Sequence, residues 1–287
     1  CEVNTAVDGT NGGACGVACT LGRTCQSSAC SSAVCAAGLA SCDGSDANGC
    51  EADLATDANH CGACGMRPPE VCNGRDDNCN TRADEGCPRD LGDLNRVDFT
   101  SPLFGNSGSS TAYDLTCPDG TFARGIFGRT NSYVTQLGLL CGRPRLVIDR
   151  AVTPHRYSVA VDATGMTAPG GAETGTAFTY TCPANTLVTR VIGRQQSVIF
   201  AVGVECAPWQ VNGNPAAGFT VTRGAVTASP LYGTASSGAA FDYTCPTQGG
   251  NASAVRQVFG RWGIVVRFIL ALTSVTVRCT LPTLLYQ

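Results

Sequence analysis

Three copies of one pattern in the C-terminal part of the chain restrict most strongly how it can fold. The stretches 101–129, 166–194 and 229–261 each carry an aromatic residue four positions before the cysteine of a Thr-Cys-Pro, and each ends on a Gly-Arg pair. A second cysteine closes each copy. Because these anchors keep their order, the pattern predicts three repeats of one structural unit. The anchors are the aromatic residues Tyr113, Phe178 and Phe241, the pairs Gly128-Arg129, Gly193-Arg194 and Gly260-Arg261, and the cysteines Cys117 with Cys141, Cys182 with Cys206 and Cys245 with Cys279.

The repeats have the pattern of β-strands. The runs AFTYTC and AFDYTC alternate apolar and polar residues, and LVTRVIGR and FAVGVEC are rich in β-branched residues. No stretch shows sustained helical periodicity. We therefore expect an all-β domain in which each repeat is a small antiparallel sheet with one internal disulfide. Three equal sheets favour pseudo-threefold closure, which removes exposed edges, so a β-prism is predicted with a β-trefoil as the alternative.

The three arginines of the Gly-Arg pairs occupy the same place in each repeat. An arginine at that place can donate hydrogen bonds to loop carbonyl groups three times over. We prefer this structural role to the alternative of three ligand sites.

Cysteine usage defines a second domain. Thirteen of the nineteen cysteines precede residue 88, and the chain has only two histidines. This density indicates disulfides and an oxidising compartment rather than a zinc protein. We expect a disulfide-stapled module over residues 1–90 and the repeat domain over residues 91–287, with repeats spanning about 97–160, 161–222 and 223–287.

The first residue is itself a cysteine. Eighteen of the nineteen cysteines can form nine disulfides, which leaves Cys1 over. We expect Cys1 to carry a lipid anchor, with an intermolecular disulfide as the alternative, and any membrane contact to run only through that lipid. The net charge of −3 and the absence of a basic stripe argue against a nucleic-acid partner.

The spacing CP-x(9)-GR-x(11)-C resembles the repeats of the vitelline membrane outer layer protein family and of bacterial jacalin-like segments. The resemblance covers about residues 97–280 and implies a β-prism I fold of three Greek-key sheets, a fold that often binds glycans. The chain departs from the bacterial pattern where Thr135 replaces the usual aspartate, and the other two repeats also lack it. The resemblance therefore implies the fold, and only weak binding of simple sugars.

The stretch VCNGRDDNCNTRADEGC, residues 71–87, resembles the metal-binding motif of MopE-like surface proteins of Gram-negative bacteria. Its cysteine-rich surroundings resemble repeats of large secreted proteins from the same group. The resemblance implies a metal site at Asn73 and Asp77 together with Asp76, Asn78, Asn80, Asp84 and Glu85. Independently, Asp76, Asn78, Asn80 and Asp84 stand at positions 1, 3, 5 and 9 of a calcium-loop spacing.

Two departures weaken this calcium loop. Thr81 stands where the motif has glycine, and Cys87 stands where a calcium loop ends on a bidentate glutamate. We expect a calcium site at Asp76, Asn78, Asn80, Asp84 and Glu85. The alternative is a disulfide-closed turn in which these side chains cap backbone amides. A second acidic cluster, Asp43, Asp46, Glu51 and Asp53, fits no ligand spacing and is expected to be a solvated turn.

Sequence motifs for catalysis are missing: the chain has no GxSxG, HExxH or SxxK, and His60 and His155 lie in different modules. We expect a non-enzymatic protein exported to the outer surface of a Gram-negative bacterium. The run RFILALTSVTV is apolar on both faces, which favours self-association and a structural subunit of a filament or coat. The alternative is a glycan-binding, lectin-like adhesin, and a hydrolase on the same scaffold is a third possibility.

Overall fold

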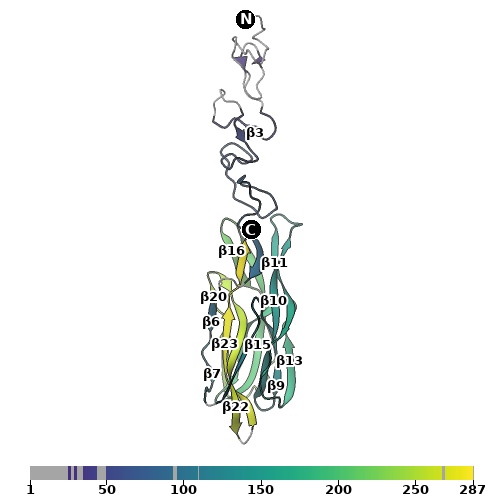
Figure 1. Cartoon of the computed structure of the whole chain (residues 1–287), viewed down its shortest axis with the longest axis vertical. Helices are drawn as coiled ribbons and strands as arrows, with labels where there is room; N and C mark the ends of the chain where they lie inside the picture. The colour runs from purple at the N-terminus through teal and green to yellow at the C-terminus, as the bar shows by residue number, and fades with distance from the viewer. Residues whose placement is uncertain are drawn as a thin grey trace. The chain divides into compact units, whose positions relative to one another are not determined.

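The computed structural model describes residues 25–26, 29–30, 35–43, 50–92, 96–108, 110–266 and 269–286 (Figure 1). The chain divides into two compact units, residues 1–87 with 214–216, and residues 88–213 with 217–287. Within the described ranges, no helix is long and apolar enough to span a lipid bilayer. Cys1 lies outside these ranges, as do the side chains of the other cysteines that precede Cys35.

The first unit is held together by overlapping disulfides. It contains four short strands, β1 (Cys25–Gln26), β2 (Ala29–Cys30), β3 (Leu39–Ala40) and β4 (Ala52–Asp53). Its described bridges each begin inside the loop that the previous one closes, so they interlock along the chain. The bridges are Cys35–Cys50, Cys42–Cys64, Cys61–Cys79 and Cys72–Cys87.

The second unit is a β-prism of three antiparallel sheets, so the all-β prediction is confirmed and the β-trefoil alternative is not the fold. A long hairpin forms the middle of each sheet: β9 (Phe122–Thr130) with β10 (Val134–Asp149), β14 (Thr186–Gln195) with β15 (Ile199–Asn214), and β22 (Ala254–Val266) with β23 (Ile269–Thr280). We name the sheets after β9, β14 and β22.

Shorter strands flank each hairpin in a Greek-key order. On one side lie β12 (Gly170–Gly171), β18 (Tyr232–Gly233) and β7 (Phe104–Gly105), paired with β10, β15 and β23. On the other side lie β13 (Thr176–Thr181), β19 (Ala239–Thr244) and β8 (Thr111–Thr116), paired with β9, β14 and β22. The remaining strands are β5 (Pro88–Gly92), β6 (Asp98–Thr100), β11 (Arg156–Met166), β16 (Gly218–Arg223), β17 (Thr227–Ala228), β20 (Thr247–Gln248), β21 (Asn251–Ala252) and β24 (Thr283–Tyr286).

One expectation was wrong: a repeat is not a sheet. The β9 sheet takes its hairpin from the first repeat and its flanking strands β12 and β13 from the second. The same exchange builds the β14 sheet from the second and third repeats. The β22 sheet closes the ring, because β7 and β8 of the first repeat pair with the hairpin of the third.

The repeat disulfides consequently join neighbouring sheets. Each runs from the cysteine that follows an outer strand to a cysteine in the next long hairpin. All six cysteines are buried, so the bridges lie within the core. The pairs are Cys117–Cys141, Cys182–Cys206 and Cys245–Cys279, with S–S distances of 1.97, 2.00 and 1.96 Å.

The aromatic residue and the glycine of the sequence pattern meet across strands. Phe178 lies opposite Gly128, Phe241 opposite Gly193 and Tyr113 opposite Gly260. A Cβ atom on Gly193 would lie 2.3 Å from the carbonyl oxygen of Ala201 and 2.5 Å from the Phe241 ring. Only glycine leaves the aromatic ring room to cover this strand, which explains why both anchors recur in each copy.

The core lies between the three sheets. It contains alternate residues of the long hairpins, among them Ile126, Leu139, Val204 and Val275. Two aromatic pairs stack in it, Phe104 with Phe241 at 4.6 Å and Phe178 with Tyr232 at 4.3 Å between ring centroids. Such pairs add stability beyond the area that they bury.

Candidate functional site

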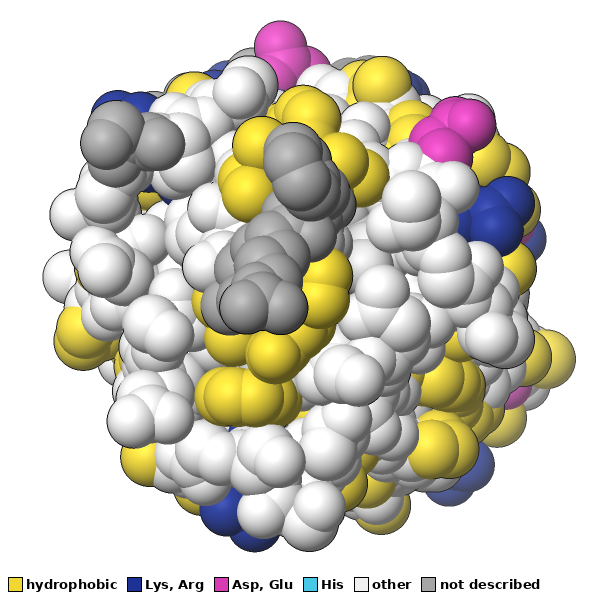
Figure 2. Space-filling model, turned by 90° about the horizontal axis from the view of Figure 1, so that it is seen from below, with side chains coloured by type: hydrophobic (Ala, Val, Ile, Leu, Met, Phe, Trp, Pro, Cys, Tyr) yellow, Lys and Arg dark blue, Asp and Glu magenta, His cyan; other side chains and the backbone are white. Residues whose placement is uncertain are grey.

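Three loops each cross a long hairpin, from the short strand beside its second strand to the strand beside its first. We call them the crossing loops; they connect β7 to β8, β12 to β13 and β18 to β19 over residues 106–110, 172–175 and 234–238. Residues from two of these hairpin turns, from the third hairpin and from the first crossing loop line one cavity, which places that loop and all three hairpins at one end of the prism. We call this the loop end, and Figure 2 views it face on.

A β-bulge fixes the start of each crossing loop. The extra residue of the bulge is Thr135, Phe200 or Thr273, and its carbonyl oxygen accepts a loop N–H. A glycine precedes that N–H with φ of +113°, +109° or +95°, and a Cβ there would lie 2.2 Å from the same oxygen. The bonds are Ala172 N to Thr135 O at 2.8 Å, Thr234 N to Phe200 O at 2.9 Å and Asn106 N to Thr273 O at 2.7 Å.

The Gly-Arg arginines fix the other end of each crossing loop. Their Nη1 atoms donate to loop carbonyl oxygens: Arg129 to Gly175 at 3.1 Å, Arg194 to Gly238 at 3.4 Å and Arg261 to Ser110 at 2.7 Å. The structural role expected for these arginines is confirmed. Each crossing loop is thus held at both ends, which limits the conformational freedom that a ligand would have to remove.

A cavity of about 300 Å³ opens at the loop end. Its polar lining comes from Asn106, Ser110, Ser197 and Thr273, and its aromatic lining from Tyr133 and Phe200. The two rings lie 5.4 Å apart at 47° and are both half-buried. None of the lining side chains that the structure describes is charged, and Arg267 of the third hairpin lies outside the described residues. In Figure 2 the acidic and basic side chains lie toward the edge of this face.

The polar groups of the cavity are partly fixed by one another. Ser110 Oγ lies 3.2 Å from Thr273 Oγ1 and donates to Gly108 O at 3.0 Å. Asn106 Oδ1 accepts the N–H of Gly108 at 3.0 Å, which orients its amide group. These hydroxyl and amide groups can both donate and accept hydrogen bonds.

Thr135, the residue in place of the aspartate, is fully buried and does not face the cavity. Its Oγ1 lies 3.0 Å from Arg129 O and 2.5 Å from Thr174 O, so its single hydrogen is donated to one of these carbonyl oxygens or shared between them. In the other repeats the bulge residues Phe200 and Thr273 line the cavity instead. The cavity was missed by sequence reasoning, because its lining comes from separate repeats that only the sheet exchange brings together.

In the acidic loop, residues 71–87, most of the predicted metal ligands accept hydrogen bonds from backbone N–H groups instead. Asp76 accepts the N–H groups of Asn80 at 3.1 Å and Thr81 at 2.7 Å, and Asp84 Oδ1 accepts those of Asn73 at 2.8 Å and Gly74 at 2.9 Å. Asn78 and Asn80 each accept an N–H two residues on, at 3.1 and 2.9 Å. The side chains of Asn78 and Asn80 both donate to Glu85 Oε1. This is the local pattern expected of a capped turn.

Glu70, which lies outside the motif, is the most deeply buried acid of this loop, with 7% of its surface exposed. Its Oε1 accepts the N–H of Asp84 at 2.9 Å. Burial raises the pKa of the Glu70 carboxyl, and the charges of Glu85 and Asp77 raise it further, whereas the backbone amides of Asp84 and Asp77 lower it. The sequence analysis missed Glu70. Its position two residues before Cys72, the first cysteine of the loop, was the signal that could have identified it.

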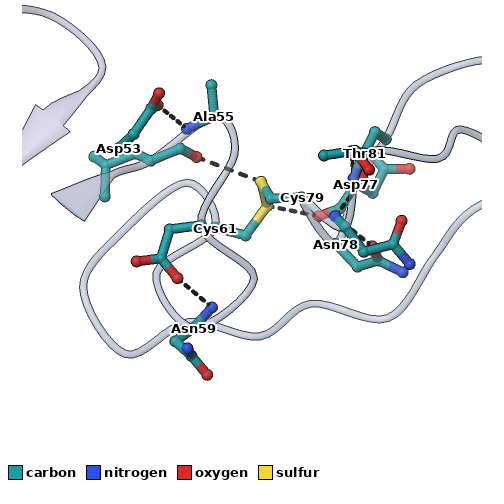
Figure 3. The surroundings of a disulfide bond; sticks show 12 residues. Asp53, Ala55, Asn59, Cys61, Asp77, Asn78, Cys79 and Thr81 are labelled. Carbon is teal, nitrogen blue, oxygen red and sulfur yellow. Dashed lines mark hydrogen bonds between the residues drawn. A yellow bond between two sulfur atoms is a disulfide. The ribbon is translucent and has the colours of Figure 1, made fainter.

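Thr81 adopts φ of +73° at the position where the motif has glycine. Figure 3 shows it with Asn78 beside the disulfide Cys61–Cys79. A positive φ costs a β-branched residue about 1–2 kcal/mol of conformational energy. Glycine avoids this cost but loses about 0.5–1 kcal/mol more backbone entropy on folding. We expect Thr81→Gly to raise the free energy of unfolding of the first unit by about 0.5–1 kcal/mol, measured by denaturant titration. Ala83→Gly, at an exposed neighbour without positive φ, is the control and should lower it.

Among the described residues, the remaining candidates form no catalytic arrangement and no metal site. Cys42, His60 and Cys64 lie within 4.8 Å of one another, but the two cysteines form a disulfide of 1.99 Å and offer no thiolate. In the second acidic cluster, Glu51 Oε1 accepts the N–H groups of Cys42 and Asp43, and Asp53 Oδ1 accepts the N–H of Ala55. Asp46, the remaining member of interest, lies outside the described residues. Over the described chain, no hydrogen bond joins His155 to a serine or a carboxylate.

No known protein family matches the chain, and no curated protein matches its sequence. Solved structures similar to it include several lectins. Wild-type Malaysian banana lectin is 11% identical with a TM-score of 0.37, covering 64% of this chain and 98% of that one. A mannose-specific jacalin-related lectin from Morus nigra, solved with mannose, is 14% identical with a TM-score of 0.39, covering 63% and 94%. A prostate-specific WGA16 glycoprotein lectin is 12% identical with a TM-score of 0.34, covering 66% and 98%. These identities and TM-scores are too low to support a function, so the function proposed below depends on the residues of this chain alone.

Proposed function

We propose that the protein is an exported, non-enzymatic glycan-binding protein that recognises neutral saccharides at the loop end. The observation that carries the proposal is the lining of the cavity, which combines uncharged hydroxyl and amide groups with two aromatic rings. Export is supported by the disulfides of both units, which are typical of proteins in an oxidising, extracellular setting.

The chemistry of a neutral sugar fits this lining. A pyranose ring presents hydroxyl groups around its edge and a face of C–H groups, so it needs polar partners on one side and an apolar surface on another. Asn106, Ser110 and Thr273 supply donors and acceptors, and Tyr133 and Phe200 supply the aromatic surface. A few placed polar groups in an otherwise apolar concavity are typical of ligand sites.

The binding should be weak for a single sugar. The described lining holds no carboxylate, so it offers no charged acceptor for the hydroxyl groups of a sugar. The crossing loop that lines it is already fixed by Arg261 and by the bulge at Thr273, which reduces the entropy cost of binding.

Self-assembly was expected because the run RFILALTSVTV is apolar on both faces of its strand, and the structure removes most of the support for it. Leu272, Val275 and Val277 of this run all face the core, because the bulge at Thr273 reverses the alternation of faces along β23. Among the described side chains of the hairpin, the exposed large apolar residues are Ile264, at 67%, and Ile269, at 39%, and Phe268 lies outside the described residues. Both isoleucines lie at the loop end, where Ile264 lines the cavity.

We expect Tyr133→Ala to weaken binding of neutral oligosaccharides by tenfold or more, about 1.4 kcal/mol, because it removes one aromatic face of the cavity. The measurement is a glycan array with the labelled wild-type protein, followed by calorimetric titration of the best ligand. Tyr286→Ala removes an exposed tyrosine outside the cavity and is the matched control.

Two results would count against the proposal. One is an array on which the wild-type protein binds no neutral glycan. The other is a Tyr133→Ala variant that binds as well as the Tyr286→Ala control.

A further inference from the structure

Two hollows adjoin β8, the outer strand of the β22 sheet. The larger, of about 430 Å³, is lined by Leu103 and Phe259, and the smaller, of about 250 Å³, by Trp262. Ala112 and Asp114 of β8 line both, so the two hollows form one groove, which we call the side groove. Neighbouring strands lie about 4.8 Å apart, so the groove extends over about 10 Å from β23 to β8.

A comparison with the β14 sheet explains the larger hollow. There Leu231 lies over Gly203, where a Cβ would come within 3.1 Å of the leucine side chain. Thr276 stands at the corresponding place in the β22 sheet, opposite Phe259. Its side chain leaves no room for a leucine over the strand, and Leu103, the counterpart of Leu231, is 47% exposed.

Asp114 supplies an oriented carboxylate to the side groove. Gln257 Nε2 lies 2.8 Å from both of its oxygens, and Thr116 Oγ1 donates to Oδ1. In the β14 sheet the corresponding Asp242 pairs with Arg190 at 3.0 Å. Gln257 replaces that arginine, and among the described residues no arginine pairs with Asp114. The exposed carboxylate therefore keeps its charge and has lone pairs left for the donors of a ligand.

Two aromatic side chains accompany this carboxylate. Phe259 lies directly opposite Asp114 across the strands, and Trp262 lines the smaller hollow. Both rings are half-buried, and the guanidinium group of Arg278 lies over the Phe259 ring at 5.3 Å from its centroid. Arg261, opposite Ala112, is a diagonal neighbour of Asp114 at about 7–8 Å. The groove thus combines aromatic surface with a strong acceptor and a strong donor of hydrogen bonds.

The side groove adjoins the cavity of the loop end. Ser110 lines the cavity, and Ala112, two residues further along the chain, lines the groove. On β23 the same holds for Thr273 and its neighbour Ser274. Successive residues of a strand are about 3.3 Å apart, so the two linings approach to within about 7 Å. Arg261 joins them, because it lines the groove and donates to Ser110 O at 2.7 Å.

We propose that one neutral oligosaccharide occupies both places, with an end sugar in the loop-end cavity and the following sugars in the side groove. The inference rests on the proposed function, which places the end sugar. In the groove Asp114 accepts hydrogen bonds from sugar hydroxyl groups, and Phe259 and Trp262 pack against the C–H faces of the rings. Hydrogen bonds to an ionised group are about twice as strong as those between neutral groups. The groove therefore adds the charged acceptor that the cavity does not offer.

The test is calorimetric titration of the full-length protein with neutral oligosaccharides of increasing length, built from the sugar that it binds best on a glycan array. The affinity of the wild-type protein should rise about tenfold or more from the single sugar to the longest chain. Asp114→Ala should abolish this rise and leave the affinity for the single sugar unchanged. Asp242→Ala, at the same place on the β14 sheet, is the matched control and should keep the rise. Phe259→Leu, which keeps an apolar side chain, should reduce the rise about threefold.

Tyr133→Ala separates this inference from the proposed function, because Tyr133 lines the cavity and not the groove. It should weaken the binding of every length, the single sugar included. An affinity of the wild-type protein that does not rise with length, or a full rise in Asp114→Ala, overturns the side groove while the loop-end cavity stands. A Tyr133→Ala variant that binds every length as the wild-type protein does overturns the proposed function, and this inference with it.

Discussion

Gly193→Ala should destabilise the second unit by about 3 kcal/mol or more, because the new methyl group would collide with both the opposite strand and the Phe241 ring. The carbonyl oxygen of Ala201 is backbone in the adjacent strand and cannot move without breaking the β14–β15 pairing. The ring cannot withdraw either, because it stacks on Phe104 in the core. Denaturant unfolding followed by tryptophan fluorescence measures the loss.

Gly92→Ala is the matched control for this substitution. A Cβ at Gly92 meets the Leu285 side chain at 3.5 Å, an ordinary van der Waals contact, so its cost should be below about 1 kcal/mol. Equal stability of the two variants would contradict the account of why the Gly-Arg glycine recurs. A double variant tests the same explanation. Phe241→Leu removes the ring that lies over Gly193, so Gly193→Ala should lower the free energy of unfolding less in this background than in the wild-type protein.

Removal of the bridge Cys245–Cys279, by replacing both cysteines with serine, should lower the free energy of unfolding by about 4 kcal/mol. The bridge has a sequence separation of 34, the largest among the described disulfides, so it restricts the unfolded chain most. It also joins β19 of the β14 sheet to β23 of the β22 sheet. The matched double variant at Cys117 and Cys141, with a separation of 24, should lose slightly less.

Thermal unfolding of the two double variants against the wild-type protein tests this ordering. Peptide mapping without reduction checks the pairing independently. Free thiols at these positions in the wild-type protein, or an unchanged midpoint for the Cys245 and Cys279 variant, would contradict the account.

The fold could be predicted from the repeats because their anchors carry its main contacts. An aromatic residue, a glycine and two cysteines recur because a ring packs over a bare strand and a disulfide joins two sheets in each copy. The exchange of strands between repeats could not be predicted. Alternating apolar and polar residues show that a segment is a β-strand, but they do not show which other strand it pairs with. The cavity was missed for the same reason: Asn106 and Phe200 meet only because the first repeat crosses over the third.

The acidic loop shows a different limit. Residue types and spacing identified a closed, acidic turn, but the same oxygens can cap an amide or bind a cation. Asp84 caps two backbone amides, and its position in the motif does not reveal this. Glu70 carries the unpartnered oxygen although it stands outside the motif, because the chain folds back and buries it against Asp84.

NMR titration of the ¹⁵N-labelled protein with the neutral oligosaccharide that scores best on the array tests the central claim most directly. The account predicts shift changes at Asn106, Ser110, Tyr133 and Thr273 that saturate together, and no response in the acidic loop at Glu70 and Glu85. Shift changes centred on another face of the prism, or none at saturating sugar, would contradict glycan binding at the loop end.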